Sequence, residues 1–505
     1  MTTHRRNALL VALSAATVAT ALLPLAPASA AAPAAPAAPA LDWTACGPAG
    51  QGQECAKLTV PLDYRDPDGE QLALAVTRIR STRPEARRGT LMVIPGGPGG
   101  SGVERLTQKG ARLAKETGGA YDLVAFDPRG VGGSSRANCR LDEADRWMVT
   151  LRSWPAADGG IDANAERSRR TAEACRRNGG AVLDSFTTAN QVRDMDRLRR
   201  ALGEQRLSAW STSYGAYVAA QYAQKFPRRT DRIVLDSSAD PDPKRVAQGW
   251  LRDMAKGAEV RFPDFAAWAA HPERDDDGLR LAARSEDVRP LFLALAARLD
   301  REPVPSTTAG VAVDGNVLRQ AMQLALGSDG AFPSLARLIK AVQDPAAATD
   351  PTRRPVLPPP LAQPLSDEDA AIMVGVICND VRWTGTVGDH RTAVAADRTA
   401  HPLTAGFPVN ITPCSFWKAP AEKPTRLTSD GPSNILMIQS RRDPNAPHSS
   451  GLKMRAALGD RARLVTVERG GHGMYLGNGN ACGDAAVTRF LLTGERPEQD
   501  VYCAN

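Results

Sequence analysis

The chain has 505 residues, of which 42% are hydrophobic and 24% are charged, so it can bury a large core and hold two or three domains. Its formal net charge is +7, but the basic residues are scattered in short runs and aromatic residues make up only 5%. A nucleic-acid groove needs a concentrated basic patch, so we expect no nucleic-acid partner.

The N-terminus has the layout of a secretory signal peptide. A positively charged segment at residues 4–6 precedes a mostly apolar run at 8–25, and Ala28-Ser29-Ala30 matches the A-x-A cleavage pattern. A membrane anchor is the alternative, but prolines follow the apolar run and no stop-transfer flank appears. We therefore expect a secreted, extracellular protein without a stable membrane anchor, cleaved near Ala30.

Residues 31–41 contain AAPAAPAAPA, which predicts an extended linker or propeptide rather than a packed element. Alternating or continuous apolar runs then predict a series of strands. In chain order these are Ala56–Tyr64, Leu72–Arg80, Thr90–Ile94, Tyr121–Phe126, Leu207–Ser211, Ile233–Leu235, Asn434–Gln439 and Leu464–Val467.

Helical patterns lie between several of these strands. These are Ala189–Leu202 and Tyr214–Phe226, and a closing helical pattern at Asp484–Leu492 follows the last strand. Strands that alternate with helices predict an α/β fold with a mostly parallel sheet flanked by helices.

The alternation fails between Asp240 and about Thr428. This stretch shows helical patterns at Phe265–Ala270, Val288–Leu299 and Val317–Leu326, followed by a proline-rich segment. We therefore expect a core formed by residues 42–240 and 429–505, with a mostly helical cap insertion at 241–428.

Eight cysteines fit a protein that folds in an oxidising compartment. They could pair in about 105 ways, and the sequence leaves the connectivity open. Neighbours along the chain suggest the pairs Cys46–Cys55, Cys139–Cys175, Cys378–Cys414 and Cys482–Cys503. The chain has no C-x-x-C and no H-E-x-x-H motif, so we expect no metal site and no cofactor.

Ser213 is the candidate nucleophile. It lies in AWSTSYGA, between a predicted strand and a predicted helix, where a tight turn would project its hydroxyl above the sheet. The usual pattern is G-x-S-x-G, and here Ser211 takes the place of the first glycine while Gly215 keeps the second.

Asp443 and His472 are the candidate acid and base. Each follows a predicted strand, and the chain order of serine, aspartate and histidine is that of the α/β-hydrolases. An imidazole there can take the serine proton while the carboxylate fixes its tautomer. His448 is the rival base and Asp236 the rival acid.

The oxyanion formed during acyl transfer needs backbone N–H donors. We expect these from Tyr214, directly after the nucleophile, and from Gly97 in the glycine-rich turn after strand Thr90–Ile94. A phosphate-binding loop is the alternative for this turn, but the G-K-[ST] sequence that it requires is missing.

Four segments together resemble the secreted tripeptidyl aminopeptidases, α/β-hydrolase serine exopeptidases related to proline iminopeptidases. They are PGGPGGSG at 95–102, FDPRGVGGSS at 126–135, STSYGAYVAAQYAQKFP at 211–227 and the segments around Asp443 and His472. The resemblance spans about residues 42–503. This sequence departs from the iminopeptidase pattern HGGPG at Pro95 and from the usual elbow at Ser211.

The resemblance implies an α/β-hydrolase that releases short peptides, tripeptides above all, from peptide or protein substrates with a free N-terminus. We expect the protein to be a monomer. Such an enzyme holds the substrate ammonium with carboxylates, and Asp380 in the insertion is the candidate. A proline iminopeptidase and a secreted carboxylic ester hydrolase with the same triad are the alternatives.

Overall fold

The computed structural model describes residues 41–504. The predicted signal peptide and nearly all of the predicted linker lie outside the described residues. Within residues 41–504, no helix is both long enough and apolar enough to cross a membrane.

A ten-stranded sheet forms the centre of the described chain, in the order β1-β2-β3-β5-β4-β6-β7-β10-β11-β12. Strands β5, β4, β6, β7, β10, β11 and β12 run parallel to one another, while β1, β2 and β3 are antiparallel to their neighbours. The prediction of a mostly parallel sheet is therefore confirmed. The strands are β1 Thr44–Ala45, β2 Gln53–Pro61, β3 Gln71–Ile79, β4 Thr90–Ile94, β5 Asp122–Phe126, β6 Leu207–Thr212, β7 Thr230–Asp236, β10 Ile435–Arg442, β11 Ala462–Gly470 and β12 Val501–Cys503.

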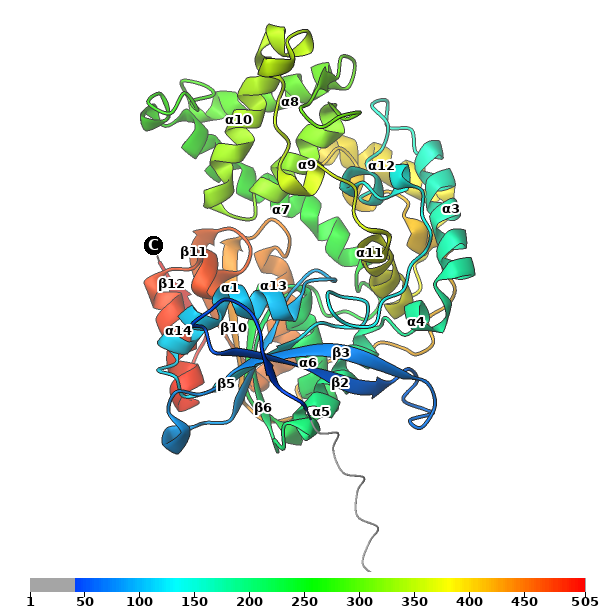
Figure 1. Cartoon of the computed structure of the whole chain (residues 1–505). Coiled ribbons are helices and arrows are strands. Elements are labelled where there is room, and N and C mark those ends of the chain that lie inside the picture. The colour runs from blue at the N-terminus through cyan, green and yellow to red at the C-terminus, as the bar shows by residue number, and fades with distance from the viewer. Residues whose placement is uncertain (1–40, 505) are drawn as a thin grey trace, which may run out of the picture. The chain divides into compact units, whose positions relative to one another are not determined.

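Helices cover both faces of this sheet (Figure 1). Helices α1 (Gly102–Glu116) and α14 (Ala481–Thr493) pack on one face, and α5 (Thr188–Ala201), α6 (Tyr214–Lys225) and α13 (His448–Leu458) pack on the other. Strand β4 is buried along its whole length and sends alternate side chains to the two faces. This double coverage explains why its sequence is a continuous apolar run.

The segment between β7 and β10 is mostly helical, and its first part forms a hydrophobic core of its own. Helices α7 (Gln248–Ala270), α8 (Ser285–Leu299), α9 (Gly315–Ala325) and α10 (Phe332–Gln343) build that core and stand together as one group in Figure 1. A short strand pair, β8 (Val304–Pro305) and β9 (Ala312–Val313), lies beside them.

The later helices of this segment pack elsewhere. Helix α11 (Asp367–Asp380) joins the core that contains α5 and α6. Helix α12 (Val387–Ala400) packs against α3 (Asp162–Asn178), which precedes the nucleophile in the chain. Helices α11 and α12 therefore pack their apolar faces against the rest of the protein, whereas α7 to α10 bury theirs mainly against one another.

Four disulfides join Cys46 to Cys55, Cys139 to Cys175, Cys378 to Cys414 and Cys482 to Cys503, the pairs that chain proximity suggests. Disulfides of this density are typical of proteins that fold in an oxidising compartment.

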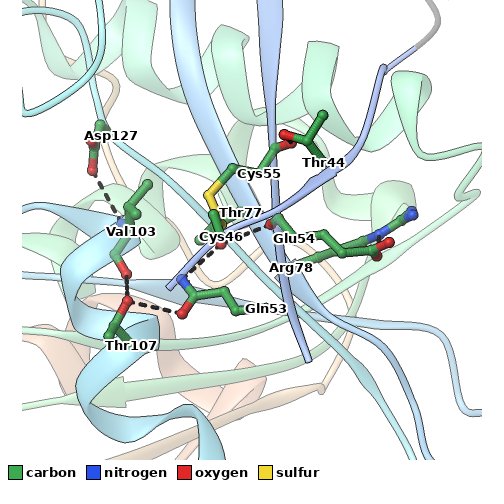
Figure 2. The surroundings of a disulfide bond; sticks show 10 residues. All are labelled: Thr44, Cys46, Gln53, Glu54, Cys55, Thr77, Arg78, Val103, Thr107 and Asp127. Atoms are coloured by element: carbon green, nitrogen blue, oxygen red, sulfur yellow. Dashed lines mark hydrogen bonds and ion pairs between the residues drawn. A yellow bond between two sulfur atoms is a disulfide. The ribbon is translucent and has the colours of Figure 1, made fainter. Parts of the chain in front are cut away.

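Figure 2 shows how the first disulfide lies beside a hydrogen-bonded path to α1. Gln53 of β2 donates to Thr77 and accepts from Thr107 of α1, at 2.9 and 3.0 Å. The first turn of α1 is fixed from another side, because Val103 N–H donates to the Asp127 carboxylate at 3.1 Å. Helix α1 is thus held rigidly against the N-terminal strands.

Candidate functional site

Ser213 occupies a sharp turn between β6 and α6. Its backbone has φ +61° and ψ −125°, a combination that non-glycine residues rarely adopt. The turn is held because Ser213 N–H donates to the carbonyl of Asp236 at 2.9 Å. A Cβ on Gly215 would stand 2.5 Å from the carbonyl oxygens of both Ile94 and Pro95, so only glycine fits there.

Ser211 has a separate, structural contact. Its side chain is fully buried and donates to the carbonyl of Val234 on the neighbouring strand at 2.6 Å. A small polar residue is therefore accommodated where glycine is commoner. Because this hydroxyl is buried in the sheet and hydrogen-bonded there, Ser211 does not compete with Ser213 as a nucleophile.

His472 and Asp443 are joined by a hydrogen bond. His472 Nδ1 lies 2.9 Å from both carboxylate oxygens of Asp443, which is fully buried. The backbone N–H groups of Asn445 and Ala446 also donate to that carboxylate, each at 2.8 Å. A proton on Nδ1 donates to the carboxylate, which leaves Nε2 as the nitrogen that can accept a proton.

Burial lowers the pKa of His472, but the charge and hydrogen bond of Asp443 more than offset this effect. The negative charge of Asp236 acts in the same direction as Asp443, while Arg105 opposes them. The net result is a His472 pKa raised above its ordinary value of 6.5.

Ser213 and His472 line one cavity of about 660 Å³. The structure therefore brings together the three residues that sequence order suggested, each from the carboxyl end of a different parallel strand. This is the edge at which parallel α/β sheets bind their ligands.

Asp236 fixes the loop that follows His472 through hydrogen bonds. Its fully buried carboxylate accepts from the N–H groups of Met474 and Tyr475, at 2.8 and 2.9 Å, and from the Ser237 hydroxyl at 3.0 Å. Burial raises the pKa of Asp236 to about 6. The rival acid thus holds the loop after His472, whereas Asp443 contacts the imidazole.

His448, the rival base, is turned away from the triad. It begins α13, and its ring contacts Arg441 and Thr466. It does not line the cavity that contains Ser213.

The insertion contacts the loops that carry the acid and the base. His472 N–H donates to the carbonyl of Gly327, which follows α9, at 2.9 Å. Arg442, directly before Asp443, pairs with Asp264 of α7 at 2.8 Å. A Cβ on Gly257 of α7 would stand 2.2 Å from the Pro444 carbonyl, so the helix backbone reaches that loop directly.

The two candidate oxyanion donors flank Ser213. Gly97 has φ +120°, and the neighbouring Gly96 approaches so closely that a Cβ on it would stand 2.7 Å from Ser213 Cβ. Gly97 lines the cavity that contains Ser213. Tyr214 is the first residue of α6, and the first N–H groups of a helix have no intrahelical partner. Gly97 therefore shares the cavity of Ser213, and the Tyr214 N–H lies at the start of the helix that follows Ser213.

The structure does not bring Asp380 to this cavity. Its carboxylate caps α5, where it accepts from the N–H and the hydroxyl of Thr188 at 2.8 and 2.5 Å. Burial raises the pKa of Asp380 to about 6. The Thr188 hydroxyl lies 2.7 Å from the Tyr214 hydroxyl, so Asp380 is linked through one residue to the side chain that follows the nucleophile.

Residues of α1 line the cavity as well, and sequence patterns did not identify them. They are Glu104, Arg105, Gln108 and Lys109. The signal was present, because Ser101 and Glu104 have the spacing of a helix N-terminus, and Ser101 Oγ accepts from Glu104 N–H at 3.0 Å. Within residues 41–504, no cluster of His, Cys, Asp or Glu side chains could hold a metal ion.

Known proteins similar to this chain are hydrolases. The sequence profile of a family described as TAP-like protein matches residues 404–503. A tripeptidyl aminopeptidase of Streptomyces lividans is 31% identical over 478 residues, which cover 92% of this chain and 85% of the relative.

Two further relatives match at lower identity. The serine protease Hip1 of Mycobacterium bovis is 27% identical and covers 92% of this chain and 91% of its own. Carboxylesterase B of Mycobacterium tuberculosis is 29% identical and covers 89% and 86%, respectively.

Proposed function

Because this chain belongs to the tripeptidyl aminopeptidase family of α/β-hydrolase serine peptidases, we propose that it releases short peptides, tripeptides above all, from free N-termini. The reaction would pass through an acyl-enzyme on Ser213. The observation that supports this most is the pairing of His472 with buried Asp443 in the same cavity as Ser213.

In the proposed mechanism, Ser213 Oγ attacks the carbonyl carbon of the scissile peptide bond while His472 Nε2 takes the hydroxyl proton. The N–H groups of Gly97 and Tyr214 donate to the oxyanion that forms. His472 then returns the proton to the leaving nitrogen as the peptide bond breaks. Water, activated by the same imidazole, hydrolyses the ester and frees the short peptide.

A panel of three substrates tests the proposal. Wild type should hydrolyse a tripeptidyl arylamide faster than a prolyl arylamide or a short-chain p-nitrophenyl ester, and Ser213→Ala should abolish all activity. Ser211→Ala is the matched control and should stay active, because among the described residues that hydroxyl forms a hydrogen bond only with the Val234 carbonyl.

Other outcomes select the alternatives. Fastest hydrolysis of the prolyl substrate would make the protein an iminopeptidase. Activity on the ester alone would make it a carboxylic ester hydrolase, the class that the name of its relative carboxylesterase B denotes.

The ammonium partner is tested separately. In tripeptide release the ammonium lies about 10 Å from the scissile carbonyl, and our candidate partner remains Asp380. If Asp380 binds the ammonium, Asp380→Asn raises KM for free peptides and leaves hydrolysis of N-acetylated substrates unchanged. Equal losses on both substrates would assign Asp380 a supporting role, through its contact with Thr188.

We further propose that the protein acts as a monomer outside the cytoplasm after removal of a signal peptide. The four disulfides support export. Mass spectrometry of the mature N-terminus and light scattering of the purified protein test these two points.

A further inference from the structure

Arg105 is the unusual side chain of the catalytic cavity. It is half-buried in the wall of the cavity, yet it makes no hydrogen bond or ion pair with any residue in the described range. Burial lowers the pKa of its guanidinium, and the charges of Asp236 and Glu104 act in the opposite direction. A half-buried guanidinium without protein acceptors can donate all of its hydrogen bonds to an anion that enters the cavity.

The neighbouring charges strengthen this argument. Lys109, one helical turn further along α1, also lines the cavity, and burial and the charge of Arg105 lower its pKa. Among residues 41–504, its ammonium donates only to the carbonyl of Leu476, at 3.0 Å. Two cations that repel each other therefore face the same space.

The acidic groups nearby do not neutralise Arg105 directly. Both carboxylate oxygens of Asp236 are already bonded to backbone N–H groups. Glu104 is exposed, and its carboxylate accepts from Gln108 at 2.9 Å. The Arg105 guanidinium thus remains available to an anion that enters the cavity.

The position of Arg105 relative to His472 indicates which part of a substrate it would meet. His472 must deliver a proton to the leaving nitrogen, so the leaving group lies on its side of Ser213. The loop directly after His472 lines the same cavity, and Lys109 is bonded to that loop. The charge of Arg105 acts on His472 itself. Both cations therefore belong to the leaving-group side.

We propose that Arg105, assisted by Lys109, binds a carboxylate on the leaving-group side of the scissile bond. The preferred substrates are then short peptides whose free C-terminal carboxylate lies one or two residues beyond the cut. This inference rests on the proposed peptidase function and adds a substrate class to it. The rigid attachment of α1 to Gln53 and Asp127 holds the site in place (Figure 2).

Four substrates with the same acyl part test the proposal: Ala-Ala-Pro-Ala as the free acid, the same peptide as its C-terminal amide, Ala-Ala-Pro-Asp amide, and Ala-Ala-Pro-p-nitroanilide. A charge-assisted hydrogen bond should make kcat/KM of wild type roughly tenfold or more higher for the free acid than for the amide. Preference for the Asp amide instead would identify an acidic side chain as the source of the carboxylate.

The variant Arg105→Gln should bring the ratio of free acid to amide close to one, whereas Arg105→Lys should keep part of the preference. Arg112→Gln is the matched control, because Arg112 lies on the same helix and near the same Leu476 carbonyl but does not line the cavity. It should keep the wild-type ratio.

Two results would overturn the inference. One is a wild-type enzyme that cleaves the arylamide and the amide but shows no preference for either carboxylate. The other is an Arg105→Gln variant that loses activity equally on all four substrates. In both cases the proposed peptidase function survives. If wild type cleaves none of the peptides, the proposed function fails and this inference fails with it.

Discussion

Asp236 offers a test of the electrostatics behind the catalytic loop. Its carboxyl is fully buried, and burial raises its pKa from 3.8 to about 6. The fold therefore favours the neutral form, and the stability that this group contributes is complete below about pH 4 and lost as the pH rises through about 6. The difference between the two pKa values corresponds to about 3 kcal/mol.

In the variant Asp236→Asn the side chain at position 236 is neutral at every pH, so this position should cause no loss of unfolding free energy as the pH rises. Terms that do not depend on pH, such as a Tyr475 N–H left without its acceptor, shift the whole curve and cancel in the comparison. Relative to the variant, wild type should lose about 3 kcal/mol of unfolding free energy between about pH 4 and about pH 7.5.

Urea unfolding with the disulfides intact, followed by tryptophan fluorescence, measures both curves. Asp68→Asn, at an exposed position in the turn between β2 and β3, is the control and should follow wild type. If the unfolding free energies of wild type and Asp236→Asn changed in parallel with pH, the reasoning would be refuted. The variant should also show a lower pKa of His472, because the charge of Asp236 raises it.

Three further predictions concern single contacts of the site. In a pH–rate profile, the kcat/KM of wild type should fall with decreasing pH through the raised pKa of His472, with its midpoint above pH 6.5. Asp443→Asn should move this midpoint to lower pH and lower kcat about 10⁴-fold. Thr188→Val should lower the unfolding free energy by about 1–3 kcal/mol in urea, since it removes the hydroxyl that donates to Asp380 and leaves the Tyr214 hydroxyl only its bond to Gln191, while Thr188→Ser should not. Gly97→Ala should lower kcat at least about 100-fold in the arylamide assay, because its Cβ would stand 2.7 Å from Gly99 N.

Much of the sheet was predictable from the sequence, because the central parallel strands are covered on both faces and contain apolar runs, whereas the partly exposed edge strand β12 was not predicted. The position of Ser213 was predictable for a related reason. A strand, a small turn and a helix occur in succession, and that local pattern marks the elbow in the sequence, while the bond from Ser213 N–H to the Asp236 carbonyl appears only in the structure.

Roles that depend on distant contacts were not predictable in the same way. Asp236 and Asp443 both follow strands, and only the structure shows that one receives backbone N–H groups while the other receives the imidazole. The chain pattern around Asp380 gave no sign that its carboxylate would cap α5. The sequence patterns gave no role to Arg105, and only the structure places it in the wall of the cavity.

The order of the strands also has a consequence for the synthesis of the protein. Ser213 lies at the end of β6, but β10 and β11, which precede the acid and the base, come only after the whole insertion. A growing chain therefore carries its nucleophile long before it has anything to activate it. The part of the chain that folds first therefore lacks catalytic activity. The enzyme becomes active only after β10 and β11 have joined the sheet.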